Sequence, residues 1–473
     1  MKRKYKDMDK DIKKAQHQDQ IAAAVSEAHE SEVRRFLTRI LQEDEKLFER
    51  FQSAVCSGRA GFDLKQYEKK VDAVIREYLG REGFISYREA NSFLHEMEAF
   101  LKEDVGMMLD DGHHAQAFAL SCYIFLKTGS VEIDDSDGGL GMFSERCADI
   151  WEEILDEADD KVRREIFEWL IGHLDSGISD YMEEYLERIL MDAFSEGDYL
   201  KELLAYTKRK AQEPRDGSDR WNDGYHVQKW VLYHIRLMEK AGYGQEEILN
   251  YCKEQWEYAK VREYYIEQCM QQKCYDEAIA ALHESLRIDA KMPGQVRMFS
   301  EKLKEAYRVS GRREDYKQQL LRLVTKDHAG NLEDFRELRG LYDAKSWQAV
   351  REEVFLALPP TAHVERLYKE EGLYDRLLEY VLQEKGLYAL QQYQDVLAAK
   401  YPQQILSKYE KELHEMAARV ADRRHYREWA NILRRMSAIE GGMDKVHEIV
   451  ADWRIRYKNR PVMIEELKPF GQQ

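Results

Sequence analysis

Proline is scarce in this sequence. Only seven of the 473 residues are proline, against about 5% in an average protein, and the first is Pro214. Glycine is modest as well, with 26 residues. Because β-rich chains need many Gly and Pro turns between short strands, this composition argues against a β-rich fold and predicts long helices. The hydrophobic share of 44% is enough to form a buried core, which excludes disorder of the whole chain.

Long apolar runs are also missing. The longest membrane-like stretch, residues 117–126, has ten residues, half of the roughly 20 that span a bilayer. The first residues are charged, and no apolar run of the length that a signal peptide needs follows them. The six cysteines have no regular spacing, so they are interpreted as reduced thiols. We therefore expect a cytoplasmic protein without membrane contact.

No catalytic signature occurs in the chain. The sequence lacks Gly-x-Ser-x-Gly, Gly-x4-Gly-Lys-Ser/Thr and Gly-x-Gly-x-x-Gly, which are the motifs of hydrolases, phosphate-binding loops and dinucleotide sites. Asp and Glu are abundant, but in a helical chain most of them belong to solvated faces. We therefore expect a protein that is not an enzyme.

Metal-ligand patterns are incomplete. The acidic loop at residues 134–138 resembles part of a calcium-binding loop, but with Gly138 at the sixth position, Ile133 and Ser144 occupy the two positions that need carboxylates. Cys269 and Cys274 have no second pair at zinc-ligand spacing. These patterns favour a helix-capping acidic turn and two packing thiols, so we expect no metal ion and no cofactor.

Amphipathic helical patterns fill most of the chain. In residues 273–289 one helical face carries Ala278, Ala281, Leu282, Ser285 and Leu286. Three of these five side chains are small, which allows a neighbouring helix to approach closely. The opening Tyr275-Asp276-Glu277-Ala278 resembles the second helix of a tetratricopeptide (TPR) repeat.

The resemblance to TPR repeats is partial. Arg262 stands where the first helix would carry its aromatic residue, and Ala290 stands where a proline often closes the unit. Similar openings recur near Gly112, Gly197 and Gly372, but at irregular intervals. The pattern therefore predicts an all-α fold, an irregular TPR-like α-solenoid of helical hairpins in which each hairpin packs against its neighbours.

Composition divides the chain into four segments. We expect a charged N-terminal arm at residues 1–30, an N-terminal helical domain at 31–211, a linker at 212–226 and a TPR-like helical-repeat domain at 227–473. The first part of this linker, residues 212–219, combines Pro, Gly and Asp without apolar residues. Within the last segment, Leu358-Pro359-Pro360-Thr361 predicts a point where a helix must stop.

Negative charge is concentrated in residues 131–200. This region has 22 Asp and Glu against 5 Lys and Arg, a net charge of −17 that equals the net charge of the whole chain. The candidate acidic partner-binding face consists of Glu152, Glu153, Asp156 and Glu157, and Glu183 and Glu184 contribute to the same region. Like charges on adjacent turns cost stability. They therefore indicate either a solubilising face or a site for a basic partner.

The C-terminal region is basic and aromatic. Its candidate residues are Trp453, Arg454, Arg456, Tyr457, Lys458 and Arg460. Aromatic residues between cations can stack on bases and neutralise phosphates. The arginines can equally satisfy the last carbonyls of a terminal helix and cover its neighbour with their aliphatic stems. The acidic net charge makes nucleic-acid binding by the whole chain an unfavoured interpretation.

Three short runs carry a family resemblance. They are residues 83–90 (Gly-Phe-Ile-Ser-Tyr-Arg-Glu-Ala), 111–117 (Asp-Gly-His-His-Ala-Gln-Ala) and 134–138 (Asp-Asp-Ser-Asp-Gly). Together they resemble the helical region that follows the zinc finger in bacterial SWIM zinc-finger proteins. The finger has a Cys-x-Cys pair followed by Cys-x-His, and neither occurs in this chain. The resemblance therefore assigns no zinc-binding or DNA-binding residue here.

These observations lead to two functional hypotheses. The first is a non-enzymatic helical-repeat scaffold that mediates protein–protein interaction, with a protein or peptide as partner, because solenoids present extended binding surfaces. The alternative is a nucleic-acid-associated accessory module that works with a SWIM-type zinc finger absent from this chain.

Overall fold

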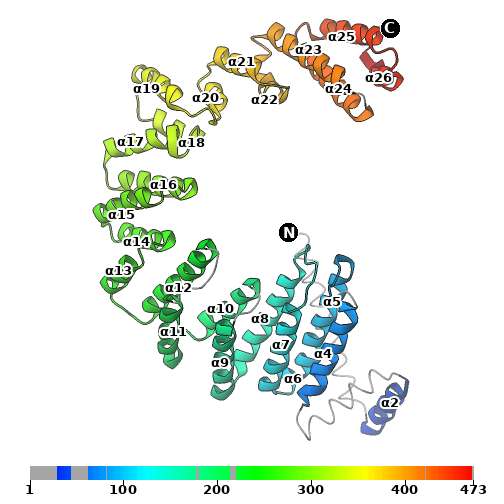
Figure 1. The fold of residues 1–473 in the computed structure, drawn as a ribbon, viewed down its shortest axis with the longest axis vertical. Coiled ribbons are helices and arrows are strands. Elements are labelled where there is room, and N and C mark those ends of the chain that lie inside the picture. The colour runs from blue at the N-terminus through cyan, green and yellow to red at the C-terminus, as the bar shows by residue number, and fades with distance from the viewer. Residues whose placement is uncertain are drawn as a thin grey trace. The chain divides into compact units, whose positions relative to one another are not determined.

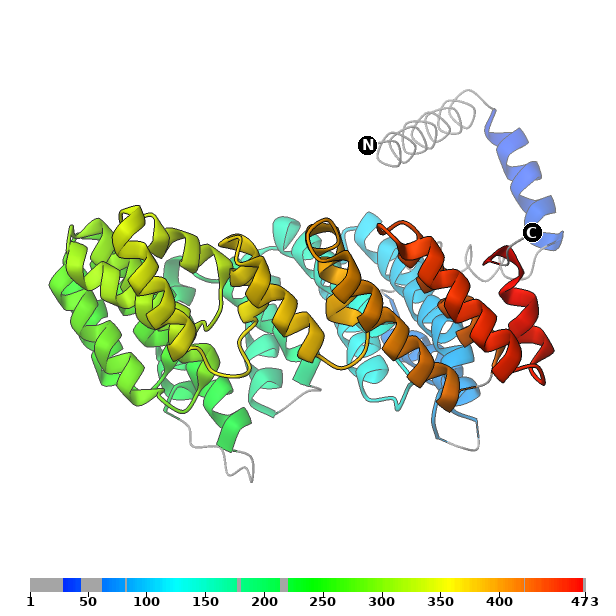
Figure 2. The same cartoon turned by 90° about the horizontal axis from the view of Figure 1, so that it is seen from above.

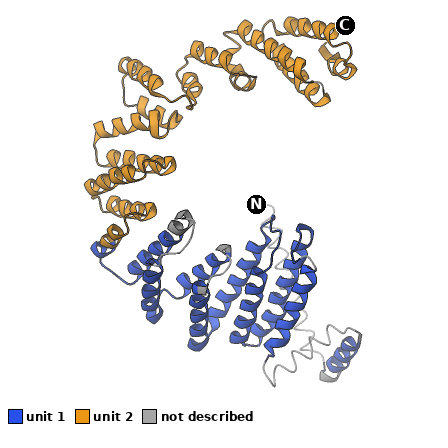
Figure 3. Cartoon of the chain, viewed as in Figure 1, with its two compact units in different colours: residues 1–248 blue, residues 249–473 orange. Residues whose placement is uncertain are grey.

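The protein forms two compact units. The computed structural model describes residues 29–43, 62–80, 83–176, 180–212, 220–420 and 422–470, and the units comprise residues 1–248 and 249–473 (Figure 3). The predicted linker does not coincide with this boundary. Its residues 213–219 lie outside the described part, as do residues 1–28 of the predicted arm, and the helix α12 already begins at Arg220.

The first unit consists of helices. Their bounds are α2 (Glu30–Glu43), α4 (Leu64–Leu79), α5 (Tyr87–Phe100), the π-helical turn η1 (Leu101–Val105), α6 (Gly106–Asp110), α7 (His114–Gly129), α8 (Gly139–Glu157), α9 (Asp160–Ser176), α10 (Asp180–Ala193), α11 (Gly197–Lys210) and α12 (Arg220–Lys240) (Figure 1). Helix α13 (Gln245–Glu254) spans the boundary between the units.

The second unit is helical as well. Its helices are α14 (Ala259–Gln271), α15 (Tyr275–Ile288), α16 (Pro293–Val309), α17 (Arg313–Arg322), η2 (Leu323–Asp327), α18 (Leu332–Arg339), α19 (Ala344–Ala357), α20 (Val364–Glu370), α21 (Tyr374–Gln383), α22 (Tyr388–Leu397), α23 (Pro402–Arg419), α24 (Arg423–Ser437), α25 (Gly442–Arg456), α26 (Pro461–Glu466) and η3 (Lys468–Phe470). Neighbours in sequence are neighbours in space, as Figure 2 shows for the side-by-side helices from α16 onward.

The fold class predicted from the sequence is confirmed. Within the described residues, the strand-type pairing consists of one isolated bridge between Ile85 and Ile133, and helices form the rest of the regular structure. Helices pack against others that are close along the chain: α15 packs against α14 and α16, whereas α8 packs against α7 and α10, and α4 against α5 and α7. The protein is therefore an all-α solenoid of helical hairpins. In the part of the chain that the structure describes, no helix combines the length and apolarity needed to cross a bilayer.

The core of the first unit forms around α7. This helix contains the longest apolar run of the sequence, and eight of its residues are buried. Trp151 of α8 is fully buried against Phe125 at a ring distance of 5.0 Å, and its indole Nε1 donates to the Ser121 hydroxyl at 2.9 Å. The run is thus too short to span a membrane but suits a helix that is covered on several sides.

Local sequence signals account for several helix ends, and one of them, the stop at Leu358–Thr361, was predicted from the sequence. Helix α19 ends at Ala357, immediately before the Leu358–Thr361 stop, and α20 begins only at Val364. Pro293 lies at the first position of α16, where its missing N–H costs nothing. Asn331 caps α18 by accepting from the Asp334 N–H at 2.9 Å. The turn before α21 uses Gly372 with a φ of 67°, a value that favours glycine.

Candidate functional site

The predicted acidic face lies on the solvent side of α8. Glu152, Glu153, Asp156 and Glu157 are all exposed there. Two basic groups lie nearby: the Arg188 Nε is 3.9 Å from Glu152, and the His114 Nε2 is 3.4 Å from Glu157. The structure therefore brings the four predicted carboxylates together on one surface, with partial compensation of their charge.

The charge of residues 131–200 is not all on that surface. Glu183, which the sequence analysis counts in the acidic region, is buried, and Glu187 is fully buried one turn further along α10. The Lys229 ammonium lies 2.7 Å from Glu187, and the Tyr233 hydroxyl donates to Glu187 at 3.2 Å. Burial raises the pKa of Glu187, although Lys229 and Tyr233 oppose the rise. Part of the acidic region thus belongs to the packing of α10 against α12.

The aromatic residues of the C-terminal candidate site are inside the protein. Trp453 is fully buried and donates from Nε1 to the His414 Nδ1 at 3.0 Å, and Tyr457 is buried too. Arg460 donates to the carbonyl of Ala417 at 2.7 Å and to that of Val420 at 3.2 Å, so it caps the end of α23. Its guanidinium covers the Tyr457 ring at 4.3 Å.

The remaining cations of this candidate site reach solvent. Arg454, Arg456 and Lys458 are exposed, and Arg456 pairs with Asp452 at 3.2 Å. Base stacking needs accessible ring faces. Because Trp453 and Tyr457 pack in the core of the second unit, the segment presents charge to solvent but not its aromatic rings.

The acidic loop at residues 134–138 serves the start of α8. Asp134 accepts from the Ser136 N–H at 3.2 Å, and Asp135 accepts from the Leu140 N–H at 3.0 Å. The bridge between Ile85 and Ile133 brings this loop beside residues 83–90, so two of the three runs that resemble SWIM proteins are neighbours. No group of three or more His, Cys, Asp or Glu in the described residues is placed to hold a metal ion.

A groove of about 430 Å³ opens on α13, α14 and α15. Its lining residues are Lys253, Trp256, Tyr265, Glu277, Ala280, Ala281 and Glu284. Trp256 packs edge-on against Tyr265 at 5.1 Å, and the Lys253 ammonium lies 5.5 Å from the Tyr265 ring. Burial raises the pKa of Tyr265 to about 12. The small side chains of Ala280 and Ala281 keep the α15 side of the groove open.

One polar group in this groove lacks a partner. The Trp256 Nε1 is buried and has no hydrogen-bond acceptor among the described residues. Glu277 and Glu284 lie two turns apart on α15. Aromatic side chains together with charges of both signs are features that interfaces use to bind a peptide.

Arg262 holds the segment that carries Trp256. This arginine departs from the TPR pattern in the sequence, and in the structure it is fully buried. Its guanidinium donates to the carbonyl oxygens of Trp256 at 2.6 Å and Glu257 at 2.9 Å, and it pairs with Asp289 after α15. The arginine therefore joins the turn before α14 to the residue after α15 by hydrogen bonds.

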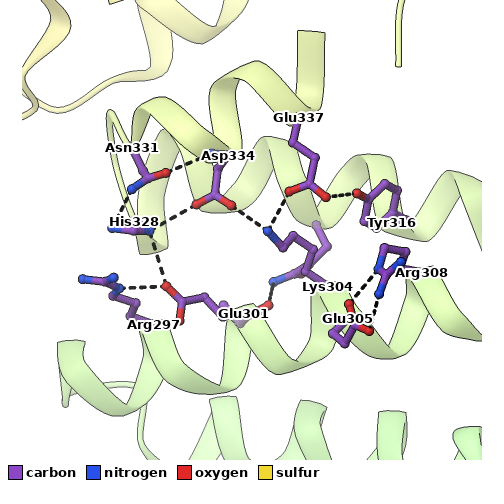
Figure 4. Close-up of polar contacts among 12 residues, drawn as sticks. Arg297, Glu301, Lys304, Glu305, Arg308, Tyr316, His328, Asn331, Asp334 and Glu337 are labelled. Atoms are coloured by element: carbon purple, nitrogen blue, oxygen red, sulfur yellow. Dashed lines mark hydrogen bonds and ion pairs between the residues drawn. The ribbon is translucent and has the colours of Figure 1, made fainter. Parts of the chain in front are cut away.

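A polar network joins α16, α17 and α18 (Figure 4). The Lys304 ammonium lies between two carboxylates of α18, at 2.8 Å from Asp334 and 2.8 Å from Glu337, and the Tyr316 hydroxyl of α17 donates to Glu337. Burial alone would lower the pKa of Lys304, but the hydrogen bonds to the two carboxylates outweigh it and raise the pKa. Burial raises the pKa of Tyr316 to about 12, with the Glu337 carboxylate adding to the rise.

The same network reaches the turn before α18. His328 places its Nδ1 at 3.1 Å from Asp334, and the Asn331 side-chain nitrogen lies 3.2 Å from its Nε2 (Figure 4). Similar bridges join other alternate helices: Lys302 of α16 contacts Glu267 of α14 at 2.7 Å, and Arg336 of α18 contacts Glu370 of α20 at 2.7 Å. These polar groups are engaged with one another, and they hold the register between successive hairpins.

Sequence reasoning missed two sets of residues. Lys253 lies on α13, Trp256 in the turn after it and Tyr265 on α14, and no motif in the sequence connects the three residues. The second set is the arginines of α24, at positions 423, 424, 427, 434 and 435. Their periodicity is visible in the sequence and could have been used to predict a basic helix face.

Comparison with known proteins gives little further information. No family model and no curated protein matches the chain. Among solved structures, one similar chain is described as a circular tandem repeat protein with novel repeat topology and enhanced subunit contact surfaces. It is 15% identical, and the match covers 88% of this chain and 96% of that chain with a TM-score of 0.19. At such a TM-score the two chains do not superpose as wholes, so nothing about function follows from the likeness.

Proposed function

We propose that this protein is a non-enzymatic helical-repeat scaffold that binds a peptide segment of a partner protein. The observation that carries the proposal is the groove on α13, α14 and α15, which combines Trp256 and Tyr265 with charged side chains on both sides. Aromatic residues supply most of the binding energy at many interfaces.

The substitution Ala280→Arg tests the groove. Ala280 is exposed, so a larger side chain there does not disturb the core, and Glu277 and Glu284 lie three and four residues away to hold the new guanidinium. Ala418→Arg is the matched control, because Ala418 is an exposed helical alanine of α23, in the same unit.

The measurement is an affinity pull-down with quantitative mass spectrometry, repeated with nuclease. A partner retained by wild type and by Ala418→Arg, but lost by Ala280→Arg, supports the proposal. Equal retention of every partner by all three proteins would contradict it. A partner set that disappears with nuclease in all three would instead favour the accessory-module hypothesis.

The relation to SWIM zinc-finger proteins and the acidic face of α8 stay predictions. If the acidic face takes a basic partner, changing Glu152, Glu153, Asp156 and Glu157 to Gln or Asn should slow association much more than it changes dissociation. An unchanged association rate at low salt would assign these carboxylates to a solvated surface.

A further inference from the structure

Helix α24 carries an arginine face. It contains five arginines and one acidic residue, Glu428. Its opposite side is buried and consists of Tyr426, Trp429, Ala430, Leu433 and Met436. With 3.6 residues per turn, the five arginines fall within a sector about 120° wide, and all of them are exposed. The arginine face is thus defined by Arg423, Arg424, Arg427, Arg434 and Arg435.

The protein compensates only part of this charge. Arg423 and Arg427 share one carboxylate, Glu466 of α26, each at 3.2 Å. Arg424 pairs with Glu428 at 3.3 Å. Two carboxylates therefore face five guanidinium groups.

The last two arginines meet no carboxylate in the described residues. Arg434 donates to the Asn431 side-chain oxygen at 2.6 Å and lies 6.0 Å from the Phe470 ring, and Arg435 has no ion pair. The arginine face therefore keeps positive charge in excess.

The helix dipole accounts for the position of only two of these cations. Arg434 and Arg435 lie in the last turn, where the helix dipole favours positive charge. Arg423, Arg424 and Arg427 lie in the first turns, where the dipole disfavours it. Glu466 and Glu428 offset the unfavourable position of these three arginines, whereas the two arginines without a carboxylate lie at the favoured end.

The chemistry of the arginine face indicates which anion. Glu466 of α26 already lies against two of its arginines, so the face accepts a carboxylate presented by a neighbouring helix. Tyr426 and Trp429 are buried, and the His425 ring is held by Asp422 at 2.6 Å, so neither large aromatic ring of this helix is available to stack on bases. These features favour an acidic protein segment over a nucleic acid.

We propose that the arginine face of α24 is a docking surface for an acidic helix of a partner protein, one with carboxylates three or four residues apart. Such a helix repeats the contact that Glu466 makes. It places its carboxylates along the row formed by Arg424, Arg427 and Arg435, whose mutual spacings are three and eight residues. Each contact is a charge-assisted hydrogen bond of the arginine–carboxylate type.

The test uses the full chain and fluorescence anisotropy. The probe is a fluorescein-labelled alanine helix with glutamate at every fourth position, and the same peptide with glutamine in place of glutamate is the negative control. At low ionic strength the glutamate peptide should bind and the glutamine peptide should not. Arg424→Gln with Arg435→Gln should weaken binding about fivefold, the product of two exposed ion pairs of ordinary strength.

A matched variant separates the arginine face from net charge. Arg287→Gln with Arg308→Gln removes two exposed arginines of the same unit, each paired with a neighbouring glutamate. It should leave the affinity unchanged. An equal loss in both double variants, or no binding of the glutamate peptide by wild type, would overturn the proposal. So would a short DNA duplex that binds wild type more tightly than the peptide and depends on Arg424 and Arg435.

Discussion

Replacing Arg262 by leucine should strongly destabilise the second unit. The side chain is fully buried, and the leucine removes its bonds to two carbonyl oxygens and its ion pair with Asp289. Asp289 is itself buried. The substitution therefore leaves a carboxylate and two carbonyls without their donor in a place that water reaches poorly.

The expected cost is about 3–5 kcal/mol, the range found when one partner of a buried ion pair is removed. A second variant tests the cause. In Arg262→Leu with Asp289→Leu the orphaned carboxylate is gone, and buried pairs replaced by apolar residues are often neutral. The double variant should recover much of the loss but not all of it, because the carbonyls of Trp256 and Glu257 stay without a donor.

Urea unfolding followed by circular dichroism measures the loss of unfolding free energy in the single and double variants. With an m-value of about 3 kcal/mol/M, the single variant should lower the midpoint by about 1 M or more. Because repeat hairpins can unfold partly independently, hydrogen exchange should place the loss in α14 and α15. The control is Arg287→Leu, since Arg287 is exposed and should change the stability little. A cost below about 1 kcal/mol, or a double variant less stable than the single one, would refute the reasoning.

Three further substitutions have defined outcomes. Lys304→Met should cost about 2 kcal/mol in urea unfolding, because it separates Asp334 and Glu337 from their common cation. Burial alone would raise the pKa of Glu337, but its bonds to Lys304 and Tyr316 outweigh burial and lower the pKa. The resulting stabilisation of wild type should therefore be complete above about pH 4.5 and disappear as the pH falls through the folded pKa, and it should be smaller in the variant, which keeps only the Tyr316 bond. His234→Gln should flatten the pH dependence of the unfolding free energy between about pH 6.5 and pH 4. Burial first, and then the charge of Lys208, lower the pKa of His234 to about 4, so in this range the folded state binds fewer protons than the unfolded chain. Acid should therefore cost wild type up to about 3 kcal/mol of stability. If the unfolding free energy of the variant depends on pH as steeply as that of wild type, groups other than His234 cause the dependence. Arg460→Met should cost about 1–2 kcal/mol of unfolding free energy and so lower the thermal midpoint, because the carbonyls of Ala417 and Val420 lose their donor. Equal midpoints for the variant and wild type would show that water replaces the guanidinium as donor.

The sequence by itself determined the fold class and several local features. Scarce proline and glycine excluded a β-rich chain, and the Pro359-Pro360 pair marked the end of α19. The face formed by Ala278, Ala281, Leu282, Ser285 and Leu286 is buried as expected. These features are local because backbone geometry and helical periodicity act over one or two turns.

Only the tertiary structure decided which polar and aromatic side chains are exposed to a partner and which are buried. Periodicity places Trp453 and Glu183 on a face of their helices, but it does not reveal that another helix covers that face. Arg262 interrupts a motif in the sequence and completes a set of hydrogen bonds in the structure. The groove of Lys253, Trp256 and Tyr265 exists because α13, α14 and α15 pack together. Burial depends on neighbours distant in sequence, and one chain read alone does not specify those contacts.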